Sequence, residues 1–94
     1  ITVLPIGAYG PQWPDIHLNP EEAVQAHRDL RGDLFVPIHW ATFDLALHTW
    51  AEPVDRLLAA GTGLRIAVPR PGQRVIADDA PVPDGWWKAL EQQT

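Results

Sequence analysis

The chain has 94 residues and a formal net charge of −5, with twelve Asp and Glu against seven Lys and Arg, which leaves room for one small domain at most. It contains no cysteine, which excludes a disulfide-stapled scaffold and a thiolate zinc site, so any metal must be bound by His and carboxylates. The scattered basic residues argue against a nucleic-acid partner, and the absence of a long apolar stretch or a targeting segment indicates a cytoplasmic protein that is not transmembrane.

The first residues read as a short buried strand over 1–6, with Pro5 near its end. The chain has no methionine and opens directly on this strand, so we expect it to be an excised piece of a longer protein. A connection follows from Gly7 to Asn19. A connection this long in a compact unit is often functional.

A helix start is the strongest local signal, because Asn19 suits an N-cap, Pro20 the first helical position and Glu22 the capping-box position. We expect this helix to continue through Leu30. His27 falls on its inward stripe, where a structural histidine is favoured. A second buried strand is expected over 34–38.

Later elements are less strongly marked. A second helix is expected over 53–60, followed by strands over 64–68 and 74–77 that are joined by a Pro-Gly turn at 69–72. Residues 78–94 read as a terminal extension in which Asp84 could cap a last helix that carries Trp86 and Trp87.

Four histidines are the candidates for chemistry, although none forms a local ligand pair with another. His39 is the best placed, since it follows an apolar strand and could project from the strand end into a cleft. From spacing alone, a buried hydrogen-bonded imidazole is favoured over a ligand at this position. His17 is either solvated or in contact with substrate, and His48 fits the rim of a site, its surroundings or the surface.

The chain has five tryptophans, a large number for its length, and packing is their favoured role. The functional alternative is that Tyr9, Trp13 and Trp40 line an apolar substrate groove.

Three phrases in this order resemble one family: Pro5-Ile6-Gly7-Ala8-Tyr9, then His17 with Asn19-Pro20-Glu21-Glu22-Ala23, then Pro37-Ile38-His39-Trp40-Ala41-Thr42-Phe43. The chain resembles the C-terminal part of a metallo-β-lactamase-fold hydrolase, and within that superfamily the N-acyl-phosphatidylethanolamine-hydrolysing phospholipase D branch and its bacterial relatives. The resemblance implies an α/β fold in which short strands with flanking helices form part of a four-layer αββα sandwich.

The resemblance also implies roles for individual residues. His39 matches a late metal-ligand histidine that binds one of two zinc ions, and it is the one ligand of that set in this chain. The resemblance places His17, Tyr9 and Trp13 at the border of the substrate cleft. It places Trp40, Thr42 and His48 around the metal ligands, where they would hold the site in position. The other ligands of the family lie upstream, so the isolated chain should be catalytically inert.

These residues lead to two hypotheses of different classes. In the first, the parent protein is a zinc-dependent hydrolase that cleaves a phosphodiester or lactone through a metal-bound hydroxide. Its substrate would be a small molecule or lipid-like. The parent would also contain an N-terminal half that is absent from this sequence. In the second, the segment is a non-catalytic binding or dimerisation module, because half of a sandwich would expose a sheet face that a homodimer could cover.

Overall fold

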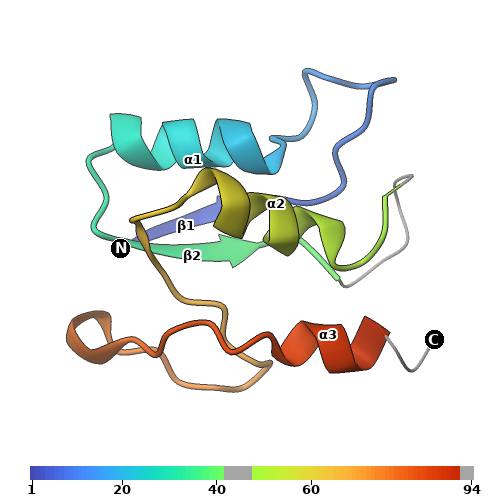
Figure 1. Ribbon diagram of the computed structural model, residues 1–94. Coiled ribbons are helices and arrows are strands. Elements are labelled where there is room, and N and C mark those ends of the chain that lie inside the picture. Colours follow the sequence, from blue (N-terminus) through green and yellow to red (C-terminus); the bar gives the residue numbers. More distant parts are fainter. Residues whose placement is uncertain (42–47, 92–94) are drawn as a thin grey trace.

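A parallel sheet of three strands in the order β1-β2-β3 is the centre of the computed structural model, which describes residues 1–41 and 48–91 (Figure 1). The strands are β1 (Thr2–Pro5), β2 (Leu34–Ile38) and β3 (Arg65–Ile66). In the parallel register Thr2 pairs with Phe35 and Leu34 pairs with Arg65. Parallel strands joined through helices give the α/β class that the sequence predicts.

Two helices cross over between the strands, α1 (Pro20–Asp29) and α2 (Glu52–Ala60). The capping box expected at α1 is confirmed, because Asn19 Oδ1 accepts from the backbone N–H of Glu22 at 2.8 Å and Glu22 Oε1 accepts from that of Asn19 at 3.0 Å. Helix α2 has Ala51 at its N-cap, with no side-chain hydrogen bond there. Its start is instead favoured by Pro53, since proline suits the first turn of a helix.

One expected strand is wrong. Residues 74–76 belong to no strand and Ala77–Asp79 form a 3₁₀ turn, η1. The carbonyl oxygen of Ala77 accepts from the Arg65 guanidinium at 2.5 Å and therefore bonds to a side chain instead of a neighbouring strand. The strand expected over 64–68 is likewise reduced to the two residues of β3. The backbone N–H of Leu64 donates to the carbonyl of Gly61 in a turn, whereas that of Ala67 still donates to the carbonyl of Phe35 on β2.

The terminal helix α3 (Trp86–Glu91) is present, and Asp84 Oδ1 accepts from the backbone N–H of Trp86 at 3.1 Å as the sequence predicts. Trp87 is buried among core residues and its indole N–H donates to Asp55 of α2 at 3.3 Å. The extension is thus joined to α2. Among the described residues no helix has the length and apolar character needed to cross a bilayer.

The two faces of the sheet differ in exposure. Helices α1 and α2 lie on the same side of the sheet (Figure 1). Thr2 and Phe35, which pair with each other, are buried, as is Ile6. On the opposite face Val3 is 54% exposed and Ile38 is 43% exposed. We call the surface formed by Ile1, Val3 and Ile38 the open face.

His27 of α1 is buried, as its place on the inward stripe predicts. Its Nδ1 lies 2.6 Å from Thr2 Oγ1, and its ring lies against Phe35 with centroids 5.1 Å apart. Nε2 is buried without a hydrogen-bond partner. Because burial disfavours the charged imidazolium, the pKa of His27 is lowered.

Candidate functional site

The carboxyl ends of β1 and β2 bring the connection over 7–19 against His39. The backbone N–H of Ile6 donates to the carbonyl of Ile38 at 3.1 Å, which extends the strand pairing to the start of this connection. At Gly7 a Cβ atom would collide with the carbonyl oxygen of His39. A glycine is therefore required here for the two segments to approach this closely.

His39 and His17 are brought together at this edge. Their ring centroids are 5.0 Å apart and the ring planes are tilted by 40°. His39 is exposed and has φ of +64°, a left-handed conformation that is uncommon for a residue with a side chain. Such strain is often found at functional sites.

His48 lies beside Tyr9, with ring centroids 4.4 Å apart and planes 22° from parallel. The backbone N–H of Ala8 donates to His48 Nε2 at 3.0 Å, so the proton of the neutral ring is on Nδ1, which lies 3.0 Å from the carbonyl oxygen of Thr49. Both ring nitrogens are thus engaged. His48 supports the connection over 7–19 and is not free to bind a metal in this arrangement.

Tyr9 is half-buried and contacts α2. Its hydroxyl donates to Glu52 Oε2 at 2.8 Å. The guanidinium of Arg56 lies over the ring of Tyr9, 4.6 Å from the ring centroid. Burial, and then the hydrogen bond to Glu52, raise the pKa of Tyr9 to about 12. The hydroxyl therefore keeps its proton and remains a donor.

Arg56 in turn makes an ion pair with Glu21 of α1, which accepts from its Nε at 3.1 Å and also from Nη2. Chiefly because of this bond, the pKa of Arg56 is raised. Sequence reasoning missed Glu21, Glu52 and Arg56. The available signal was the spacing of Glu52 and Arg56, which places them one turn apart on the same side of a helix.

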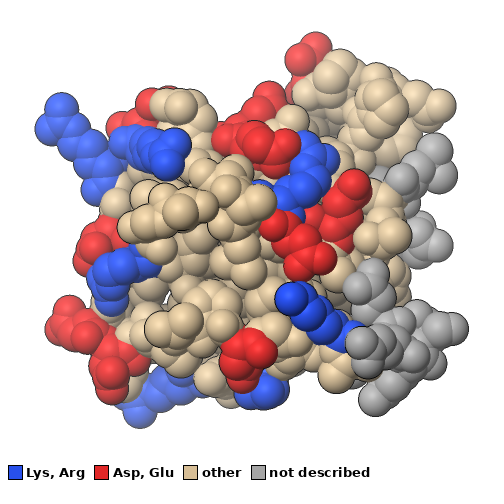
Figure 2. All heavy atoms as spheres, viewed as in Figure 1, with Lys and Arg blue, Asp and Glu red and all other residues tan. Residues whose placement is uncertain are grey.

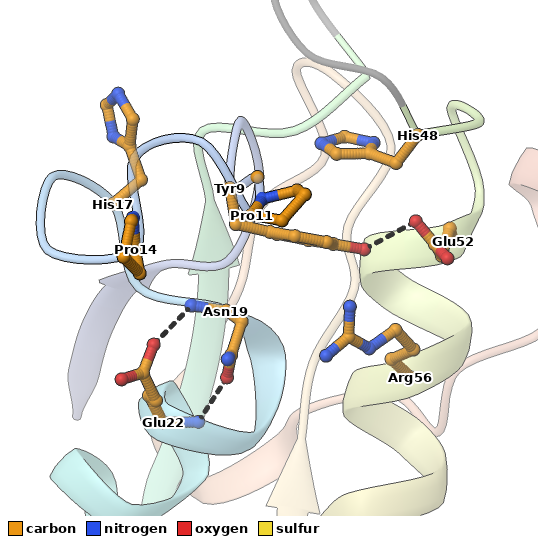
Figure 3. A pocket seen from close by; sticks show the side chains of 10 residues that line it. Tyr9, Pro11, Pro14, His17, Asn19, Glu22, His48, Glu52 and Arg56 are labelled. Carbon is orange, nitrogen blue, oxygen red and sulfur yellow. Dashed lines mark hydrogen bonds between the residues drawn. The ribbon is translucent and has the colours of Figure 1, made fainter.

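A cavity of about 420 Å³ lies between the connection over 7–19 and the N-terminal ends of α1 and α2 (Figure 3). His17 and His48 are on its rim, and the side chains that line it are Tyr9, Pro11, Pro14, His17, Asn19, Glu22, His48, Glu52 and Arg56, together with Gly10. Its charged groups are of both signs. Figure 2 shows the same mixture over one face of the molecule, with Lys and Arg dispersed among Asp and Glu.

Three predicted site residues lie outside this cavity, and one of them is His39, which is not among the residues that line it. Trp13 turns back on its own segment, where its indole N–H donates to the carbonyl of Ala8 at 2.9 Å, and it borders a separate hollow that also reaches His17. Trp40 packs with Trp86 and Trp87, with centroids 5.8 Å and 6.1 Å away. Thr42, the remaining candidate, lies outside the described residues.

The donor set for zinc is incomplete in the part of the chain that the structure describes. No group of three or more His, Cys, Asp or Glu that could hold a metal ion occurs among those residues. A zinc site needs at least three protein ligands, and this edge offers the imidazole of His39 with that of His17 beside it.

The chain is similar in sequence to several known proteins. The first 40 residues match a family model described as a beta-lactamase superfamily domain. An uncharacterised protein of Mycobacterium tuberculosis is 53% identical over 93 residues, which cover 94% of this chain and 25% of that protein, and one of Mycobacterium bovis matches equally.

Two named enzymes match a shorter stretch. N-acyl-phosphatidylethanolamine-hydrolyzing phospholipase D 1 of Caenorhabditis elegans is 38% identical over 60 residues, which cover 61% of this chain and 17% of that protein. The mitochondrial enzyme of the same description from Saccharomyces cerevisiae is 34% identical over 59 residues, covering 61% and 13%. The chain thus spans about a quarter of the length of the mycobacterial relatives and less of the two phospholipases. These matches confirm the resemblance to hydrolases of the metallo-β-lactamase fold, and the small α/β structure with three parallel strands is consistent with part of a β-lactamase superfamily domain.

Proposed function

We propose that the longer protein that carries this chain is a zinc-dependent hydrolase, and that His39 is one of its metal ligands. The observation that carries the proposal is the placement of His39, an exposed imidazole at the carboxyl end of β2 whose ring centroid is 5.0 Å from that of His17. Open α/β sheets bind ligands at the carboxyl ends of their strands.

The chain's own residues fix the backbone that carries this imidazole. Gly7 lets the segment after β1 pass close to the carbonyl oxygen of His39, and His39 itself has a left-handed backbone conformation at the end of β2. Zinc bound there would supply a Lewis acid and lower the pKa of a water molecule. His17 would lie at the edge of the reacting group, where an imidazole can orient substrate or exchange a proton.

For the substrate we propose a phosphodiester or lactone, either a small molecule or a lipid-like one. The two phospholipase D relatives are named for hydrolysing a phospholipid, which favours the phosphodiester. The cavity of about 420 Å³ beside His17 is of a size that suits a small-molecule group.

Replacing His39 with alanine in the full-length protein tests the proposal. We expect zinc content to fall and hydrolysis of bis(p-nitrophenyl) phosphate and of a simple lactone to be lost. Gln25→Ala is the control, because Gln25 is exposed on α1 and bonds to Asp29, away from the site. Unchanged zinc content and activity in the His39 variant would show that the assignment is wrong.

The open face supports a proposal about partners. Val3 and Ile38 are roughly half exposed on a sheet whose other face is covered, and apolar sheet faces are costly to leave in water. We propose that the remainder of the longer polypeptide packs here, as a second layer of a four-layer sandwich. The alternative, a non-catalytic module that dimerises through this face, predicts that the isolated chain sediments as a dimer and that Val3→Lys makes it monomeric.

A further inference from the structure

Tyr9 of the connection over 7–19 contacts His48 and two residues of α2. The ring of His48 stacks on the ring of Tyr9, with the two centroids 4.4 Å apart. The guanidinium of Arg56 lies 4.6 Å from the centroid of the Tyr9 ring. Its hydroxyl is bonded to Glu52 at 2.8 Å. We call Tyr9, His48, Glu52 and Arg56 the tyrosine clamp.

The clamp joins the connection to both helices. Glu52 and Arg56 are on α2, and Arg56 is also paired with Glu21 of α1, so the ring of Tyr9 is held by elements that pack on the sheet. The backbone of the neighbouring Ala8 is fixed as well, because its N–H donates to His48 and its carbonyl accepts from Trp13.

The same connection carries His17. Between Tyr9 and His17 it forms successive turns, in which the N–H of Trp13 donates to the carbonyl of Gly10 at 3.2 Å and the N–H of Ile16 donates to that of Trp13 at 3.3 Å. At its far end Asn19 starts α1. The place of His17 is therefore fixed by α1 on one side and by the clamp on the other.

We propose that Tyr9 is a positioning residue whose bond to Glu52 and packing in the clamp hold the imidazole of His17 against His39. This rests on the proposed function and deepens it, because the sequence assigned Tyr9 to substrate contact. Tyr9 also lines the cavity beside His17, but its ring is packed in the clamp and its hydroxyl is bonded to Glu52, so it acts on the reaction through His17.

Tyr9→Phe in the full-length protein is the first test, because it removes the hydroxyl and keeps a ring in the clamp. We expect kcat to fall roughly tenfold to a hundredfold, the range that a small displacement of a reacting group can cost, with KM and zinc content unchanged. In histidine-labelled protein, the nuclear Overhauser contact between the rings of His17 and His39 should weaken. Glu52→Gln, which keeps an acceptor for the hydroxyl, should retain more activity than Glu52→Ala.

A double-mutant cycle separates positioning from direct action. If Tyr9 acts through His17, then Tyr9→Phe has little further effect on kcat in a His17→Ala background. Additive losses would overturn the proposal, as would normal kcat in Tyr9→Phe or an undisturbed contact between the two imidazoles. Gln25→Ala is again the control. The outcomes are distinct from failure of the proposed function, which would appear as a His39→Ala protein that keeps its zinc and its activity.

Discussion

The imidazoles of His17 and His39 lie with their ring centroids 5.0 Å apart, although one comes from a connection and the other from the end of a strand. Parallel pairing of β1 with β2 brings both segments to one edge of the sheet. In a parallel sheet such an edge collects the residues that follow each strand, so the pair is a consequence of topology.

The isolated 94-residue chain should bind zinc weakly. His39 and His17 offer two imidazoles at most, which is fewer than the three ligands a zinc ion needs. Isothermal titration of the chain with zinc, compared with the full-length protein, measures the difference. Stoichiometric tight binding by the chain alone would contradict the idea that the remaining ligands come from elsewhere in the polypeptide.

Gly7→Ala should displace His39 and lower stability, since the added methyl group would collide with a backbone oxygen that cannot move aside easily. We expect a loss of about 1–3 kcal/mol in the free energy of unfolding, as for other overpacked sites, together with reduced zinc content in the full-length protein.

Gly72→Ala is the matched control for Gly7→Ala. Gly72 has φ of +85° and open space around its Cα, so alanine there should cost about 1 kcal/mol through its backbone alone and leave zinc content unchanged. Urea denaturation measures the stability of the two variants, and metal analysis measures their zinc content. Equal zinc content in both would refute the link between Gly7 and His39.

Local signals predicted much of the fold. Helix α1 begins where Asn19, Pro20 and Glu22 indicate, and β2 occupies residues 34–38, because capping and short apolar runs depend on neighbouring residues. At the end of the strand expected over 74–77, the carbonyl oxygen of Ala77 accepts from the Arg65 side chain of β3, a contact that no local pattern encodes.

Only some residues of the candidate site could be predicted from the sequence. The motifs that resemble a known family contain Tyr9, His17 and His39, and the structure places His39 beside His17 and Tyr9 beside His48. The partners of Tyr9 on α2 could not be predicted, since isolated carboxylates and guanidinium groups in a sequence are by default solvated surface. Their pairing depends on how α2 packs beside the connection.

Asn19→Ala should cost about 1 kcal/mol of stability, because it removes the side-chain acceptor of a complete capping box. Asn19→Ser, which retains a capping oxygen, should restore most of that loss. Urea denaturation followed by circular dichroism measures both. Equal stability of the alanine and serine variants would show that the capping bonds contribute nothing at this helix.

His27 should make the stability of the fold fall as the pH is lowered. Its pKa in the folded state is below the ordinary value of 6.5, chiefly because burial disfavours the charged ring. Below that ordinary value the unfolded chain binds more protons than the folded one, so the contribution of His27 is complete above pH 6.5 and is lost as the pH falls. The slope for one proton is at most about 1.4 kcal/mol per pH unit.

Urea denaturation of the full-length protein between about pH 5.5 and 7.5 measures this slope. His27→Gln should flatten it, because an amide does not titrate but can still bond to Thr2 Oγ1, which lies 2.6 Å from Nδ1 in the folded chain. Gln25→Ala is the control and should keep the slope, since Gln25 is exposed on α1 and carries no titratable group. If the His27 variant shows the same pH dependence as this control, then the buried imidazole is not the group that couples folding to protonation.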